Sequence, residues 1–110
     1  MRPIQESDVF HAIAHPARRA ILLALKLRER SASELAQPFP MSMAAISQHL
    51  RLLEDASLVA VRREGRQRMY RLQPRPLREV VRWADEFAAY FGERLDGLGE
   101  YLDRKHGVPR

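Results

Sequence analysis

The stretch SMAAISQHLRLL (Ser42–Leu53) decides how this chain folds. Ile46, Leu50 and Leu53 recur at the i, i+4, i+7 spacing of one buried stripe on an α-helix. The opposite side of the same helix is small and polar, with Ala44, Ser47, Gln48 and Arg51. Such a face fits a DNA major groove, where amide and hydroxyl groups can hydrogen-bond base edges. The stretch therefore predicts a helix that packs on one side and contacts DNA on the other.

A basic hairpin follows after a short gap, in the sequence VAVRREGRQRMYRL (Val59–Leu72). Its strands are expected at Leu58–Arg63 and Gln67–Leu72, joined through Glu64, Gly65 and Arg66. Residues 59–75 contain six arginines and one glutamate, so this region alone accounts for the formal net charge of +5. Concentrated positive charge favours a polyanionic partner. Nucleic acid is favoured over a membrane because no lysine-rich amphipathic helix accompanies the charge.

Two short helices are expected before these segments. Ser7 can cap the first, which is expected to run to about Ala14 before His15 and Pro16 break it. Pro16 suits the first position of a second helix, expected over Ala17–Arg28. Its core stripe is Ile21, Leu22 and Leu25, and its solvated side is Arg18, Arg19, Lys26 and Arg28.

A third, short helix has two candidate starts. Ser31 and Glu34 have the spacing of a capping box, and Ser33 alone is the other N-cap candidate. We favour Ser33, which leaves Ser31 and Ala32 extended. Pro38 and Pro40 then force a turn. Ser42 caps the fourth helix, which is expected to reach about Ala56, so that the third and fourth helices form a helix-turn-helix.

The last part of the chain predicts one long helix within residues 75–105, opened by Pro76 and ending near Lys105. Its apolar stripe is longer than a core of about 75 residues can cover, so a second copy of the chain is the expected partner. The dimer interface is expected on the first and last helices, at Val9, Phe10, Trp83, Phe87, Tyr90, Phe91, Leu95, Leu98 and Leu102. The aromatic residues of this set leave open a pocket for a small-molecule effector.

The composition limits the classes of protein to consider. With 110 residues, the chain predicts one domain over residues 1–110, mainly helical with a small β-hairpin. It contains no cysteine, which excludes disulfides and thiolate metal sites. Neither a signal-peptide core nor an apolar run of about 18 residues is present, so we expect no membrane partner and a cytoplasmic location.

Four segments together resemble the ArsR-type winged-helix repressors, which are small dimeric bacterial regulators. They are FHAIAHPARRAILLAL (Phe10–Leu25), SELAQPFPMS (Ser33–Ser42), AAISQHLRLLEDASLV (Ala44–Val59) and REGRQRMYRL (Arg63–Leu72). The ordered combination of the HPxR junction, the SxHLxxL helix and the EGR wing is specific. The resemblance implies a winged helix-turn-helix fold. It also implies a homodimer that binds a short inverted repeat in double-stranded DNA and usually represses a nearby operon or its own gene.

The resemblance also indicates the DNA contacts. Gln48 and Ser47 are the expected base readers, and Arg66 beside Gly65 is expected to reach a minor groove or a phosphate. The expected contacts to the DNA backbone, which set affinity and salt dependence, are Arg51, Arg62, Arg63 and Arg68. The other positions on the recognition helix are Ser42, Met43, Ala44, Ala45 and His49. For His49, a packing or helix-positioning role stays open.

Other chemistry finds little support in the residues. No cofactor is expected, because the carboxylates of the last helix are poor zinc or nickel ligands without imidazole or thiolate beside them. His11 and His15 stay open as a metal pair, with capping or packing as the alternative for His15. No enzyme is expected, since Ser47 and His49 point about 200° apart on a helix. The alternative function is a winged-helix adaptor that binds protein or RNA without operator specificity.

Overall fold

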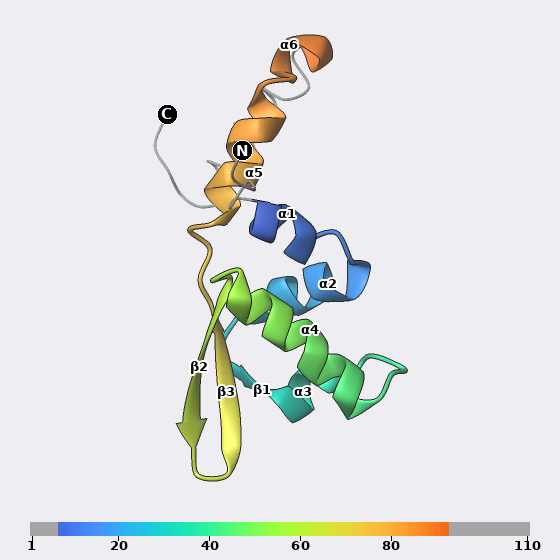
Figure 1. The fold of residues 1–110 in the computed structure, drawn as a ribbon, viewed down its shortest axis with the longest axis vertical. Coiled ribbons are helices and arrows are strands. Elements are labelled where there is room, and N and C mark those ends of the chain that lie inside the picture. Colours follow the sequence, from blue (N-terminus) through green and yellow to red (C-terminus); the bar gives the residue numbers. More distant parts are fainter. Residues whose placement is uncertain (1–6, 93–110) are drawn as a thin grey trace, which may run out of the picture. The chain divides into compact units, whose positions relative to one another are not determined.

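A computed structural model of the chain describes residues 7–92, which divide between Val80 and Val81 into two compact units. The first unit contains α1 (Ser7–Ala12), α2 (Pro16–Leu25), β1 (Arg30–Ser31), α3 (Ala32–Ala36), α4 (Met43–Asp55), β2 (Val59–Glu64) and β3 (Gln67–Leu72) (Figure 1). α5 (Leu77–Asp85) begins in this unit, and α6 (Ala88–Phe91) belongs to the second. The predicted class, mainly helical with a small β-hairpin, is confirmed, while the single-domain organisation stays a prediction.

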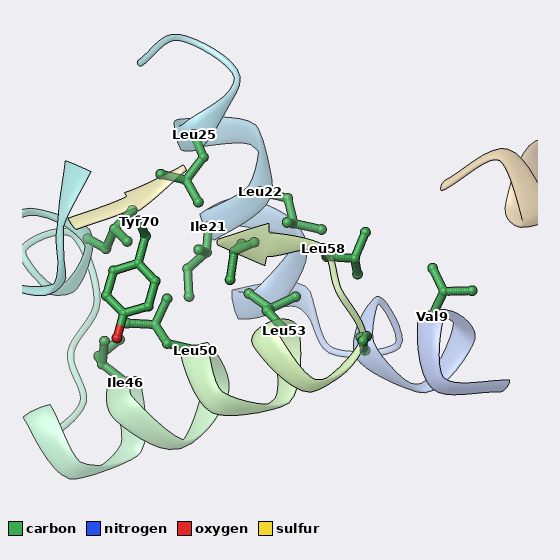
Figure 2. Close-up of a cluster of buried hydrophobic side chains, with 13 residues drawn as sticks. Val9, Ile21, Leu22, Leu25, Ile46, Leu50, Leu53, Leu58 and Tyr70 are labelled. Atoms are coloured by element: carbon green, nitrogen blue, oxygen red, sulfur yellow. The ribbon is translucent and has the colours of Figure 1, made fainter. Parts of the chain in front are cut away.

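The core of the first unit forms around α4, which contacts α1, α2, α3 and β2. Ile46, Leu50 and Leu53 are no more than 1% exposed, as the helical spacing predicted. In Figure 2 they lie beneath the apolar side chains of α2, with Tyr70 of β3 beside Ile46 and Leu50. Burying each of these aliphatic side chains contributes about 1.5–3 kcal/mol, so α4 is held in place mainly by its apolar side.

The first two helices are shorter than predicted, and one side chain lies elsewhere than expected. α1 ends at Ala12 rather than Ala14, and α2 ends at Leu25 rather than Arg28. The prediction that Arg18 is solvated is wrong, because the residue is only 6% exposed. Its Nε donates to the carbonyl of Ala12 at 2.7 Å, and its Nη2 donates to the carbonyl of His11 at 3.1 Å. These carbonyls lie at the C-terminal end of α1, where that of His11 also accepts a bond from the Ala14 amide at 3.2 Å, and the buried guanidinium gives each of them a donor.

The third helix begins at the candidate that we did not favour. Ser31 Oγ accepts a hydrogen bond from the Glu34 amide at 3.1 Å, and Glu34 Oε1 accepts one from the Ser31 amide at 2.9 Å. This reciprocal capping box overturns the preference for Ser33, since only Ser31 has a carboxylate at the required third position. Arg28 also donates to Glu34 at 2.7 Å, and together with the Ser31 amide it lowers the pKa of Glu34 to about 2.

A three-stranded antiparallel sheet includes a strand that the sequence did not predict. The strand order is β1-β3-β2, with Tyr70 of the central strand opposite Arg30 on one side and Val61 on the other. β1 contains only two residues, which is too short for an alternating pattern to be recognised. The β2–β3 hairpin turns through Gly65 and Arg66, and the φ of +62° at Gly65 is one that glycine adopts without steric cost.

The prediction of one long terminal helix is wrong within the described residues. α5 ends at Asp85, and the amides of Glu86 and Phe87 bond back three residues, to Trp83 and Ala84 at 3.1 and 3.0 Å. This tighter turn ends the α-helical ladder before α6 begins. α6 ends at Phe91 and is followed by Gly92 as its C-cap, whose φ of +56° residues with a side chain rarely adopt. The predicted continuation to Lys105 lies outside the described residues.

The capping box predicts unequal effects for two neighbouring serines. Ser31→Ala should lower the free energy of unfolding by about 1 kcal/mol, because the Glu34 amide loses its acceptor at the start of α3. Ser33→Ala removes the same hydroxyl from an exposed position within the helix and should leave stability within about 0.5 kcal/mol of the parent. Urea unfolding followed by circular dichroism measures both. A larger loss for Ser33→Ala than for Ser31→Ala would contradict the capping box.

Candidate nucleic-acid interface

The outer face of α4 is open to solvent, as the sequence predicted. Ser42 Oγ accepts a hydrogen bond from the Ala45 amide at 3.1 Å and so caps the start of the helix. The exposed residues on this face are Ser42, Met43, Ala44, Ser47, Gln48 and Arg51, while Ala45 is half-buried. The core stripe holds the opposite side, so the helix presents hydroxyl, amide, methyl and guanidinium groups along one exposed edge. These are the groups that read bases and phosphates in a major groove.

His49 lies between the exposed face and the core, where it contacts other residues of the protein. Its Nδ1 lies 3.1 Å from Nη1 of the buried Arg18, and its ring centroid lies 4.5 Å from that of His15. Burial lowers the pKa of the His49 imidazole, and the charges of His15 and Arg18 lower it further. These contacts favour the helix-positioning role that the sequence left open for His49 over a direct contact to DNA.

His15 caps α2, and its surroundings do not fit a metal site. Its Nδ1 accepts a hydrogen bond from the Ala17 amide at 3.0 Å, and its ring packs against His49. Within residues 7–92, His, Asp and Glu side chains form no group of three or more arranged to hold a metal ion. The capping role weighed for His15 is therefore the one that the geometry supports, and pairing of His11 with His15 around a metal is disfavoured.

The tip of the β2–β3 hairpin carries a group of exposed arginines. Arg63 and Arg68 lie directly opposite each other in the antiparallel register, and Arg66 occupies the turn. None of these three forms an ion pair within the part of the chain that the structure describes. Like charges in directly opposed positions destabilise a sheet. A polyanion bound across the tip would relieve this repulsion.

The register places these arginines relative to α4. Arg63 and Arg68 lie on the same face of the hairpin as Val61 and Tyr70, because directly opposed residues share a face and alternate residues repeat it. Tyr70 packs toward Ile46 on the core side of α4 (Figure 2). The two arginines therefore extend the helix-facing side of the hairpin beyond the core. In Figure 1 the hairpin projects past the helices, which leaves this end uncovered.

Arg62 differs from the other arginines of the hairpin because it is already paired. Its Nε and Nη2 donate to the two carboxylate oxygens of Glu29 at 3.0 and 2.7 Å, and Nη2 also lies 2.8 Å from Glu64. The hydrogen bonds from Arg62 lower the pKa of Glu29, and the two carboxylates raise the pKa of Arg62. The structure thus gives Arg62 a partner within the protein, where the sequence suggested only a DNA phosphate.

The predicted dimer residues divide into three groups. Val9 is 3% exposed and belongs to the core of its own chain, so it is not available to a partner. Phe10 is partly buried and packs against the same core. In the second unit Trp83 and Phe87 meet edge-on at 5.2 Å between ring centroids, and Phe87 lies 6.4 Å from Tyr90. The exposed fractions of these aromatics are 57% for Trp83, 42% for Phe87, 84% for Tyr90 and 53% for Phe91. Leu95, Leu98 and Leu102 lie outside the described residues.

Sequence reasoning missed two residues that position the interface. The helical spacing of the second helix puts Arg18 on its solvated side, although the HPxR junction quoted above contains it. Glu29 carries no motif at all. Its pairing with Arg62 joins residues 33 positions apart in the sequence, and it depends on an unpredicted strand that places Glu29 beside the sheet. Only the three-dimensional register reveals this contact.

These features together define a winged helix-turn-helix protein. A family model described as a helix-turn-helix domain matches residues 13–62. The chain is 35% identical over 81 residues to the transcriptional repressor SdpR of Bacillus subtilis, covering 74% of this chain and 90% of that one. A crystal structure of an ArsR family transcriptional regulator has a TM-score of 0.73 and 32% identity, covering 86% of this chain and 97% of that one.

A second structure, an ArsR-like transcriptional regulator from Rhodococcus sp. RHA1, has a TM-score of 0.68 and 30% identity, covering 91% of this chain and 92% of that one. The chain belongs to the ArsR family of winged helix-turn-helix transcriptional regulators. The relatives named here are a transcriptional repressor and two transcriptional regulators. Across residues 7–92 the helices are all too short or too polar to span a bilayer.

The Glu29–Arg62 pair predicts a change in salt dependence. Glu29→Gln leaves Arg62 with Glu64 as its remaining ion-pair partner, so Arg62 should become more available to DNA phosphates. The plot of log affinity against log salt for random-sequence DNA should then steepen, by about one at most. Adding Arg62→Ala should return the slope to the parent value, and Arg62→Ala alone should flatten it less than Arg66→Ala does. Fluorescence anisotropy over a salt series measures these slopes.

Asp55→Asn is the matched control, because it removes one negative charge from an exposed position at the end of α4. If Asp55→Asn steepens the slope as much as Glu29→Gln, then net charge alone accounts for the effect and Arg62 is not held back by Glu29.

Proposed function

We propose that this protein is a sequence-specific DNA-binding repressor that acts as a homodimer on an inverted-repeat operator. α4 enters the major groove, Gln48 and Ser47 contact base edges, and the arginines of the hairpin grip the flanking backbone. The observation that carries the proposal is the exposed polar face of α4, held by a buried stripe on its other side. The family assignment supports DNA as the partner and regulation of transcription as the outcome.

The wing supplies affinity in this proposal, and α4 supplies discrimination. Arg63, Arg66 and Arg68 are exposed on one projecting tip, and guanidinium contacts to phosphate depend on salt rather than on sequence. Gln48 offers one amide donor and one amide acceptor, the pair that matches adenine in the major groove. This division predicts different consequences for losing either type of residue.

Homodimerisation is proposed from the second unit. Exposed large aromatic side chains gather here, at Trp83, Phe87, Tyr90 and Phe91. The ring of Phe87 already lies against those of Trp83 and Tyr90. Exposed aromatic clusters of this kind mark interaction surfaces. A two-fold partner would cover them and would bring a second recognition helix to the same DNA.

Gln48→Ala should weaken binding to a duplex selected from a random library by about 1–3 kcal/mol and leave binding to unrelated DNA nearly unchanged. Arg66→Ala should weaken both and flatten the salt dependence. Gel-shift titrations on the two duplexes measure these effects. The matched controls make the same changes at other exposed positions: Gln37→Ala at the C-cap of α3 for Gln48→Ala, and Arg78→Ala in α5 for Arg66→Ala.

Two outcomes would count against this assignment. Equal losses on both duplexes for Gln48→Ala would remove it from the base-reading residues. Failure of the selection to enrich any sequence, together with binding that depends only on salt, would favour the protein- or RNA-binding adaptor over the operator-binding repressor.

Phe87→Ser should shift the protein from dimer toward monomer in sedimentation-velocity runs at micromolar concentration, because Phe87 contacts both Trp83 and Tyr90 in the exposed cluster. Operator affinity should fall with it, since each monomer then holds one half-site. Leu23→Ser is the control, as it removes an exposed apolar side chain from α2. A parent protein that sediments as a monomer at this concentration would rule out the proposed dimer.

A further inference from the structure

The buried guanidinium of Arg18 joins three parts of the first unit. Its Nε and Nη2 bind the carbonyls of Ala12 and His11 at the end of α1, while Nη1 lies 3.1 Å from Nδ1 of His49 on α4. The rest of the guanidinium is enclosed, since Arg18 is 6% exposed. Arg18 therefore fixes the position of the His49 ring relative to α1 and α2, and hence the rotation of α4 at the residue next to Gln48.

The contact with Arg18 also determines which form of His49 is compatible with the structure. Arginine is always protonated and can only donate, so Nδ1 of His49 must be the acceptor and the ring proton must lie on Nε2. A second proton would go to Nδ1, directly against the Nη1 donor. The hydrogen bond then has no acceptor, and two cations lie at its two ends.

Within residues 7–92, no carboxylate is among the groups whose charge acts on His49, so nothing there compensates for this proton. Of the described residues, the charged or titratable groups that affect it are Arg18 of α2 and His15 at the N-cap of α2. α1 contributes the two carbonyls that already bind Arg18. The pKa of His49 is lowered by burial first and then by the charges of His15 and Arg18, which agrees with this placement.

We propose that Arg18 is a positioning residue for the reading helix, whose hydrogen bond to neutral His49 aligns α4 for base contact, and that protonation of His49 breaks this alignment. The inference rests on the proposed DNA-reading role of α4. It assigns to the α1–α2 junction, which lies away from the exposed face, control over how well α4 discriminates one sequence from another.

The sign of the pH effect separates this mechanism from general electrostatics. Lowering the pH adds positive charge, which strengthens binding to any DNA. If protonation of His49 also releases α4, binding to the selected operator gains less than binding to random DNA. The ratio of the two affinities should therefore fall as the pH drops through the pKa of His49, below the usual value of 6.5.

The experiment measures this affinity ratio from pH 8 to pH 5 in the parent and in two variants of equal shape. His49→Asn places an amide oxygen where Nδ1 stood, so it keeps the hydrogen-bond acceptor but cannot titrate. The leucine of His49→Leu has the same shape as asparagine and offers no acceptor. We expect about a tenfold fall in the ratio for the parent, as for the loss of one hydrogen bond to a charged group. The ratio should stay high and flat for His49→Asn, and low and flat for His49→Leu.

Three further variants test the assignment to this contact. Arg18→Lys keeps the charge but cannot make all three bonds in the same geometry, so it should lower the ratio at pH 8. His15→Asn retains an N-cap without a titrating ring, and His11→Asn removes an exposed imidazole. Both should keep a ratio that falls with pH, and in His15→Asn the midpoint should move upward because the charge of His15 no longer lowers the pKa of His49. A flat profile for either one would move the titration away from His49 and overturn the proposal.

A measurement without DNA keeps this inference separate from the proposed function. In NMR titrations of the free protein, the amide signals of α4 around Gln48 should shift with the same midpoint as the His49 ring, and should not shift with that midpoint in His49→Asn. If they do so while no operator can be selected, the linkage stands and the repressor assignment fails. If α4 is insensitive to His49, or if His49→Leu discriminates as well as the parent at pH 8, the linkage is wrong.

Discussion

Burial of the apolar side of α4 is the constraint on which the other features depend. Ile46, Leu50 and Leu53 are almost completely enclosed by α1, α2, α3 and the sheet, so the helix has one rotational setting in which its core is satisfied. That setting leaves Gln48 and Ser47 exposed. The polar residues need no stabilising contacts of their own, because the hydrophobic side supplies the free energy that holds the helix. Folding therefore does not fix the residue types at these exposed positions, and recognition can determine them.

Much of this arrangement could be predicted from the sequence, because periodicity and turn chemistry act locally. The buried stripe of α4, its Ser42 cap and the strands of the hairpin all follow from spacings within a dozen residues. The missed features depend on contacts between distant segments. Arg18 looks like an ordinary surface arginine until the end of α1 and His49 are placed beside it. The sequence alone could have predicted Ser31 rather than Ser33 as the N-cap, since Glu34 stands three residues after Ser31, at the spacing of a capping box.

The prediction of one long terminal helix is wrong for a different reason. Apolar residues at helical spacing predict which side chains share a face, but they do not require the backbone ladder to be unbroken. Bonds from Glu86 and Phe87 to carbonyls three residues back end α5, while Trp83, Phe87 and Tyr90 still form a cluster of rings. The aromatic residues of the predicted dimer interface are therefore exposed and clustered without one continuous helix, and the interface itself stays a prediction.

Ser31 is both the last residue of β1 and the N-cap of α3, so no linker separates the sheet from the first helix of the helix-turn-helix. Ser31 also pairs with Met69 on β3, the central strand of the wing. A pull on the wing would therefore reach the start of α3 through one shared residue, with no hinge to absorb it. Mechanically, the β2–β3 hairpin and the α3–α4 helix pair are joined without a flexible linker.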